Sequence, residues 1–212
     1  MGNLAVHAVT VFMGFFAIMN PVANTPVFIG LTSGDAPHAK RLVARNSVLL
    51  AFAVTAVFCL AGKLVFELFG ISLPALRLTG GVVVFLIGFH MLQGEPSPVH
   101  SPSEEDTQRS LDTELSVAIS PLAVPILAGP GTIATAMNYS ASGGVQNLLV
   151  TVAAFALLCV ITYGFFLFGE RFVAYIGDSA VKVVTRLMGL ILAVIGSQML
   201  IQGIYGAVHN FA

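Results

Sequence analysis

The sequence predicts an all-α polytopic membrane protein, and three observations lead to this fold class. Of the 212 residues, 57% are hydrophobic and only 9% are charged, whereas soluble domains carry about 25% charged residues. Residues 148–169 contain no charged side chain, and a helix of that length crosses a hydrocarbon core of about 30 Å. Two apolar stretches are interrupted by proline, at Pro21 and at Pro130, in matching positions of the two halves of the chain.

We expect six transmembrane helices, in two groups of three. They are predicted at residues 4–31, 47–69, 75–94, 115–142, 147–169 and 183–207, with breaks at 20–26 and 129–131. The N-terminus lacks a basic region before its first apolar stretch, so a cleaved signal peptide is not expected. The chain therefore divides into a first three-span repeat at 1–94, an acidic, proline-rich linker at 95–114 and a second three-span repeat at 115–212.

The two halves resemble each other at a constant offset of 109 residues. Several of the matching residues are proline, glycine or arginine, which chance matches in an apolar sequence would not favour. Because each half has an odd number of spans, the second half must enter the membrane from the opposite side, which predicts inverted repeats. The matches include Pro21/Pro130, Ser33/Ser142, Arg77/Arg186, Gly80/Gly189, Gln93/Gln202 and Gly94/Gly203.

The lysines and arginines predict the orientation in the membrane. Seven of the nine fall in the linker or in the loops after the first and fifth spans, and only Lys63 and Arg77 fall on the other side. The positive-inside rule then places the linker in the cytoplasm and both termini on the periplasmic or extracellular side. We expect Arg77 and Arg186 to anchor span ends at the interface. The stripes formed by Gly80, Gly88 and Gly189 should be close-packing surfaces.

The first break is polar as well as rich in proline. Pro21 and Pro26 cannot donate backbone hydrogen bonds, and Asn20, Asn24 and Thr25 supply side chains that can pair with the freed groups. Asn24 or Thr25 before Pro26 resembles a helix cap, which predicts a half-helix at residues 27–32. In lipid such a break persists only inside the protein or beside a polar cavity.

The second break combines glycine with proline. Pro130 stands between Gly129 and Gly131, and Thr132 is the expected cap of a half-helix from 133 to about 141. Thr135 and Asn138 would share one face of that half-helix.

Inverted repeats would bring the two breaks together near the membrane midplane. Two half-helix N-termini would then offer N–H groups to a carboxylate, and free carbonyls near Met19 and Ala128 would suit an ammonium group. The alternative interpretation is that both breaks are kinks that serve helix packing.

Several other functions are disfavoured by what the sequence lacks. It has no phosphate-binding motif for ATP and no basic patch for nucleic acid. No aspartate or glutamate lies centrally in a predicted span, which removes the usual carboxylate for proton coupling. Na⁺ or H⁺ coupling stays open, as does uncoupled transport, and no cofactor is expected. A membrane-embedded enzyme is disfavoured because no span carries a His, Asp or Glu cluster or a nucleophile–base pair. Cys59 and Cys159 are expected to be packed core thiols.

At the two breaks the chain resembles the MarC family of inner-membrane proteins. The family's first motif, N-P-[IV]-G-N-x-P-[IV]-F, is matched by residues 20–28, with Ala23 in place of the usual glycine. Its second motif, P-L-A-x-P-x-L-A-G-P-G-x-I, is matched by residues 121–133. This resemblance implies a six-span inner-membrane protein that moves glycine, alanine or similar neutral amino acids.

The sequence thus predicts a secondary transporter of small neutral amino acids in the inner membrane, with the bilayer and a small solute as partners. An exporter or channel for another solute remains the alternative, and a homo-oligomer stays open. The predicted substrate-binding residues are those at the two breaks and on the second half-helix: Asn20, Pro21, Asn24, Thr25, Pro26, Gly129, Pro130, Gly131, Thr132, Thr135 and Asn138.

Overall fold

The computed structural model describes residues 2–33, 35–94, 118–141 and 144–211. Every regular element in these ranges is a helix, which confirms the all-α prediction. The elements are α1 (Gly2–Met19), α2 (Pro21–Leu31), α3 (Pro37–Phe69), α4 (Leu73–Gln93), η1 (Ala118–Leu127), α7 (Pro130–Ala141), α8 (Gly144–Leu167), α9 (Gly169–Ile176) and α10 (Asp178–Phe211).

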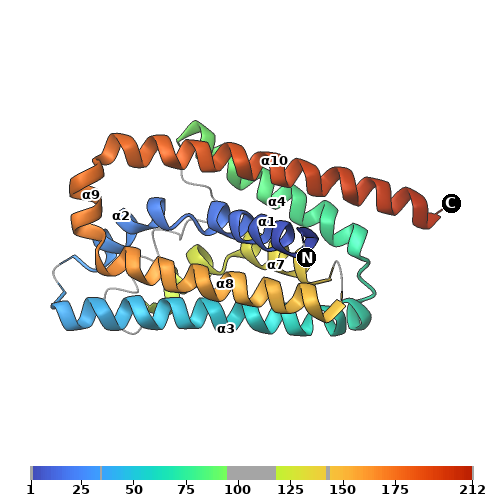
Figure 1. The fold of residues 1–212 in the computed structure, drawn as a ribbon, viewed down its shortest axis with the longest axis horizontal. Coiled ribbons are helices and arrows are strands. Elements are labelled where there is room, and N and C mark those ends of the chain that lie inside the picture. Colours follow the sequence, from blue (N-terminus) through green and yellow to red (C-terminus); the bar gives the residue numbers. More distant parts are fainter. Residues whose placement is uncertain (1, 34, 95–117, 142–143, 212) are drawn as a thin grey trace.

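The helices form two outer pairs with shorter helices between them (Figure 1). One pair is α3 with α8, and the other is α4 with α10. Between these pairs lie α1, α2 and α7, which contact both sides, and η1, which packs against α3. The short helix α9 crosses one end of the bundle and joins α8 to α10.

Five segments of the described chain are long and apolar enough to cross a membrane. They are Leu4–Leu31, Pro37–Gly62, Leu73–Gln93, Gly144–Leu167 and Ser179–His209. The predicted fourth span is divided between η1 and α7, each of which is too short to be counted on its own. The predicted linker at 95–114 lies outside the described residues.

Helix α3 begins ten residues before the predicted span at 47–69, so that boundary was wrong for the helix. The apolar pattern marks where the membrane could begin, whereas the helix start is set by Pro37, which suits the first helical turn. Lys40, Arg41 and Arg45 therefore lie on the first turns of a helix and not in a loop. The helix ends at Gly70, whose φ of 62° is a conformation that glycine adopts without steric cost.

Glycines bring α4 and α10 into close contact, which confirms the predicted packing stripes. A Cβ atom on Gly81 would lie 2.9 Å from the carbonyl oxygen of Gly196. A Cβ atom on Gly189 would lie 2.8 Å from the carbonyl oxygen of Gly88. Distances below 3.0 Å to backbone atoms leave no room for a methyl group, so this backbone-to-backbone approach depends on glycine.

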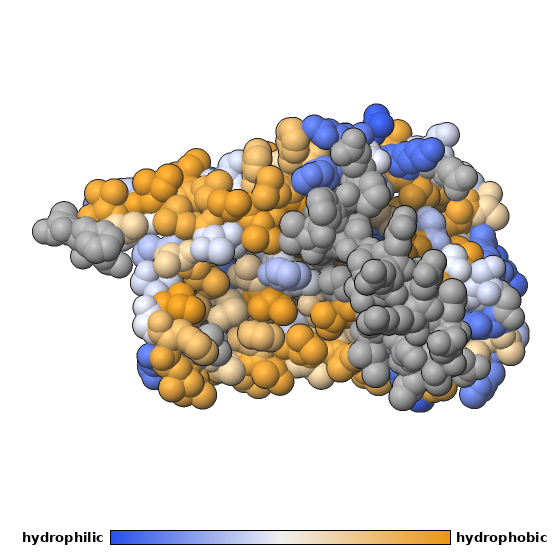
Figure 2. All heavy atoms as spheres, turned by 180° about the vertical axis from the view of Figure 1, so that it is seen from behind, coloured by the Kyte–Doolittle hydropathy of each residue, from blue (hydrophilic) through white to orange (hydrophobic). Residues whose placement is uncertain are grey.

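The surface separates by polarity along the bundle. Figure 2 shows a broad hydrophobic band, with hydrophilic side chains gathered mainly toward the end where α9 lies. Arg41 and Arg171 are exposed at that end. Such a band is what a lipid-facing surface requires.

Candidate functional site

The first break is a single residue, Asn20, which joins α1 to α2. Its φ of 38° and ψ of 72° are left-handed, and among the described residues it is the one non-glycine with positive φ. The Asn20 N–H still donates to the Phe16 carbonyl at 2.9 Å, so α1 continues up to this residue. Its side-chain Oδ1 accepts from the Ala23 N–H at 3.2 Å, which makes Asn20 the N-cap of α2.

The predicted cap at Asn24 or Thr25 was therefore wrong, and α2 begins at Pro21 instead of residue 27. The Asn24 amide donates to the Met19 carbonyl at 2.6 Å, and the Thr25 hydroxyl donates to the Pro21 carbonyl at 2.7 Å. The carbonyl of Met19, expected to be free for a ligand, is thus occupied. Pro26 lies inside α2, where Asn24 and Thr25 pair with backbone groups around the break.

The second break has a different construction. In η1 the backbone forms wide π-helical turns, and the Ala128 N–H donates to the carbonyl five residues earlier, at Ala123, at 2.8 Å. Such turns are rare and occur often at functional sites. Helix α7 then begins at Pro130, so the prediction that Thr132 caps a helix starting at 133 was wrong. Because proline has no N–H, it suits the first helical position, and Thr132 lies inside the first turn.

The two breaks lie against each other in the core. A Cβ atom on Gly131 would lie 2.8 Å from Cδ1 of Ile18 and 2.7 Å from Cδ1 of Ile87. The first turn of α7 therefore packs against the last turn of α1, two residues before Asn20, and against α4. Gly131 is buried at this crossing, and a larger residue there would have to displace the ends of both isoleucine side chains.

Most buried or half-buried hydroxyl groups in the described part of the chain are hydrogen-bonded to their own helix. They donate to the carbonyl four residues earlier, a habit of serine and threonine in apolar helices. This holds for Thr25, Thr32, Ser47, Thr151, Thr162, Thr185 and Ser197.

Three threonines at the centre of the molecule depart from this habit. Thr55 on α3 and Thr132 and Thr135 on α7 are at most 1% exposed, and their hydroxyls have no hydrogen-bond partner. The Nδ2 atom of Asn20 is also buried and unpaired. Leaving a buried polar group unpaired costs about 1–3 kcal/mol, so each of these atoms needs an explanation.

Thr55 was not predicted from the sequence, where it stands alone in an apolar run. The structure brings it near α7, because the side chains of Cys59 and Ser140 meet in a hydrogen bond. Thr55 lies one helical turn before Cys59, on the same face of α3. No sequence signal distinguishes it from threonines that bond to their own helix.

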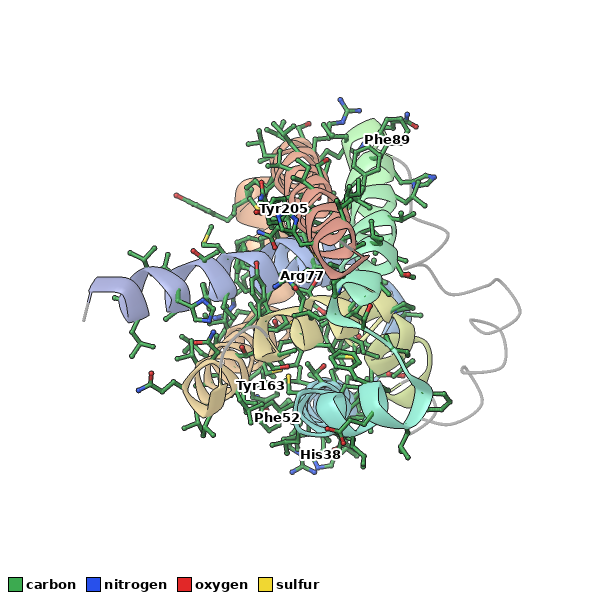
Figure 3. The ribbon with its side chains drawn as sticks, turned by 90° about the vertical axis from the view of Figure 1, so that its right-hand side faces the viewer. His38, Phe52, Arg77, Phe89, Tyr163 and Tyr205 are labelled. Atoms are coloured by element: carbon green, nitrogen blue, oxygen red, sulfur yellow. The ribbon has the colours of Figure 1, made fainter. Side chains whose placement is uncertain are left out.

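Asn138 has a partner that the sequence did not suggest. The Nε–H of Arg77 on α4 donates to its Oδ1 at 2.8 Å, and Figure 3 shows Arg77 near the centre of the bundle when it is viewed along its length. Arg77 was expected at the interface, yet it is partly buried and reaches inward to α7.

The predicted site residues thus divide into three groups. Asn20, Thr132 and Thr135 are buried with unpaired atoms, at the start of α2 and the start of α7. Asn24, Thr25 and Asn138 are paired within the protein. The others shape the backbone: Pro21, Gly129 and Gly131 are buried, Pro26 is partly buried and Pro130 is exposed.

This arrangement can bind a small polar solute without charged side chains. The N-termini of α2 and α7 carry the partial positive ends of helix dipoles. The unpaired hydroxyls can donate or accept, and the Asn20 amide can donate. In the described part of the chain no group of three or more His, Cys, Asp or Glu residues could hold a metal ion.

Comparisons with known proteins identify the family of the chain. The MarC family model, which describes integral membrane proteins, matches residues 5–208. The membrane protein YvbG of Bacillus subtilis is 36% identical over 199 residues, covering 93% of this chain and 94% of YvbG. A membrane protein of Pyrococcus horikoshii is 36% identical over 196 residues, covering 92% of this chain and 93% of its own length.

A third relative carries the family name. The inner membrane protein MarC of Escherichia coli (strain UTI89) is 32% identical over 203 residues, covering 92% of each chain. No solved structure matches the chain. With the family model matching almost its whole length, the chain belongs to the MarC family of integral membrane proteins.

Proposed function

We propose that this protein is a secondary transporter that carries small neutral amino acids across the inner membrane. The observation that supports this best is the group of buried, unpaired polar atoms where α2 and α7 begin. A protein that folded only for stability would pair these atoms, as it pairs its other buried hydroxyls. A bound solute would pair them in turn.

The chemistry of the site favours a small zwitterion. A carboxylate suits the first-turn N–H groups of Gly131 and Thr132 and the Nδ2 donor of Asn20. An ammonium group suits the oxygen atoms of Thr55 and Thr135, which can accept hydrogen bonds. Ile18 and Ile87 crowd Gly131, so a glycine- or alanine-sized molecule fits better than a large one.

We also propose that the two halves are inverted repeats, with the broken helices at equivalent places. Helices α2 and α7 begin at Pro21 and Pro130, which are 109 residues apart. The broken helix of each half packs on the long second helix of the other half: α1 and α2 contact α8, while η1 and α7 contact α3. The third helices of the halves, α4 and α10, pack on each other as a pair related by a twofold axis would.

Asn24 and Thr25 have a supporting role in this proposal. Their hydrogen bonds pair the backbone around the first break, which holds Asn20 in its left-handed conformation. Arg77 holds Asn138 in a similar way on the far half of α7. The packing-kink interpretation accounts for these paired residues, but it leaves the unpaired atoms of Asn20, Thr55, Thr132 and Thr135 unexplained.

Uptake by proteoliposomes tests the proposed function. Purified protein should accumulate labelled glycine and alanine, with little uptake of glutamate or lysine. Imposed Na⁺ and H⁺ gradients, each applied alone, identify the coupling ion or show that transport is uncoupled.

The variant Asn20→Gly tests the site within the same assay. Glycine keeps the left-handed backbone without strain and costs only a few tenths of a kcal/mol as a cap, yet it removes the amide. We expect alanine uptake at limiting concentration to fall about tenfold, with an unchanged unfolding temperature. Wild-type uptake by Asn20→Gly would remove this residue from the site. Absence of amino acid uptake by the parent protein would overturn the function itself.

A further inference from the structure

A second feature lies away from the helix breaks, at the charged end of the bundle. The end of α2, the start of α3, the end of α8 and α9 line a hollow of about 590 Å³. Its lining combines aromatic rings with charged side chains. They include Tyr163, Phe166, Phe168, Asp35, Lys40, Arg41, Glu170 and Arg171.

The charges of this hollow are unevenly paired. Lys40 Nζ lies 2.8 Å from Glu170 Oε1, and this ammonium group holds the pKa of Glu170 below its usual value. Lys40 and Glu170 therefore neutralise each other. Arg41 and Arg171 remain, both exposed, against the single carboxylate of Asp35. The hollow thus has an excess of arginine over free acid.

An apolar groove lies beside the hollow, between α3 and α8. It has a volume of about 280 Å³, and Arg45 stands at its edge, one helical turn after Arg41. The groove is lined by Val48, Leu49 and Phe52 of α3 and by Ala156, Cys159, Val160 and Tyr163 of α8.

Tyr163 lines both the hollow and the groove, so the two adjoin at this residue. Figure 3 shows Phe52 and Tyr163 near each other where α3 and α8 run side by side. The basic hollow and the apolar groove therefore lie next to each other.

We propose that this site binds one anionic phospholipid. Arg41, Arg45 and Arg171 contact the phosphate, because guanidinium groups pair with phosphate oxygens in two-pronged hydrogen bonds. One acyl chain follows the groove past Tyr163 toward Val48 and Ala156. A free anion would leave the groove empty, and a zwitterionic lipid would place its own cation among three arginines. Basic pockets between transmembrane helices bind anionic headgroups for these reasons.

Native mass spectrometry of the detergent-purified protein tests the headgroup contact. Phosphatidylglycerol should bind at one site more tightly than phosphatidylcholine. The variant Arg45→Gln should weaken phosphatidylglycerol binding roughly fivefold. Lys182→Gln is the matched control, since Lys182 is exposed on α10 and does not line the hollow. Equal losses in both variants would reduce the effect to general surface charge and overturn the site.

A second pair of variants tests the groove. Val160 and Val194 are both exposed on transmembrane helices, at 68% and 61%, but only Val160 lines the groove. Val160→Phe fills the groove and should reduce phosphatidylglycerol binding, whereas Val194→Phe should not. Glycerol phosphate, which has no acyl chain, should bind far more weakly than the lipid. If it binds as tightly, or if Val160→Phe binds lipid normally, no acyl chain occupies the groove and the proposal fails.

Discussion

Hydrogen bonding divides the buried threonines of this protein into a structural group and a group of candidate binding residues. The hydroxyls of Thr151 and Thr162 donate to carbonyls of their own helix, at 2.7 Å and 2.8 Å, and so need no hydrogen-bond partner from another helix or from a ligand. Thr55, Thr132 and Thr135 are equally buried, but their hydroxyls have no partner. A difference in hydrogen bonding, at equal burial and with the same residue type, is what identifies the second group.

Replacing Thr55 with valine should therefore lower transport without lowering stability. Valine keeps the shape of threonine and removes a hydroxyl that costs about 1–3 kcal/mol while unpaired. We expect the unfolding temperature to stay the same or rise, and alanine uptake to fall several-fold. Thermal unfolding followed by fluorescence, together with proteoliposome uptake, measures both effects.

Thr151→Val is the matched control for this prediction. It removes a hydroxyl that is hydrogen-bonded to Asn147, so it should cost about 1 kcal/mol of stability and leave uptake unchanged. If Thr55→Val instead destabilises the protein as Thr151→Val does, the Thr55 hydroxyl has a structural partner and lies outside the site.

For single residues, the sequence predicted where the helices break better than it predicted which residue caps the next helix. The steps Asn20–Pro21 and Thr25–Pro26 both have the pattern of a cap before proline. Only Asn20 adopts the left-handed conformation that starts α2. Local pattern could not choose between them, because the choice depends on Asn24 reaching the Met19 carbonyl. Thr55 could not be predicted, because what distinguishes it is a buried hydroxyl without a hydrogen-bond partner, which only the structure reveals.

At the scale of elements, the sequence predicted the helices and both breaks, while several boundaries moved. Helix α3 starts at Pro37 instead of residue 47, because apolar composition indicates where a chain can enter the membrane and not where its helix begins. The glycine stripes were predictable from their spacing, and they do form the contact between α4 and α10. The contact between Arg77 and Asn138 joins residues 61 positions apart, which no local pattern could suggest.

The contact between α4 and α10 should be the most sensitive to added volume. A Cβ atom on Gly88 would clash with the backbone of Ala193 and lie 2.6 Å from the Gly189 carbonyl oxygen. The backbones would have to separate, so Gly88→Ala should destabilise the protein by about 1–3 kcal/mol, as overpacking does. Thermal unfolding in detergent measures this loss.

Gly164 on α8 provides the opposite case. A Cβ atom there would have no neighbour within 4 Å, so Gly164→Ala should stabilise the protein by about 0.5–1 kcal/mol through helix propensity alone. If Gly88→Ala and Gly164→Ala shift the unfolding temperature in the same direction, the backbones of α4 and α10 are not packed as closely as the structure shows.

At the scale of the whole molecule, charge is distributed unevenly between the two ends. Lys40, Arg41 and Arg171 gather around the hollow beside α9. The opposite end carries the C-terminal turn of α10 with His209. Because basic residues favour the cytoplasmic side, this asymmetry supports the proposed orientation, with the hollow facing the cytoplasm. The anionic lipid proposed for it would then come from the inner leaflet.

Cysteine labelling in intact cells tests this orientation with residues that the structure describes. His38 is exposed next to Lys40, and His209 is exposed at the far end of α10. The native Cys59 and Cys159 are buried and should react little with a membrane-impermeant maleimide. We expect His209→Cys to react from outside the cell, and His38→Cys to react only after the membrane is permeabilised. Labelling of His38→Cys in intact cells, with protection of His209→Cys, would place the hollow outside. The proposed lipid would then have to come from the outer leaflet, and the positive-inside assignment of this chain would be wrong.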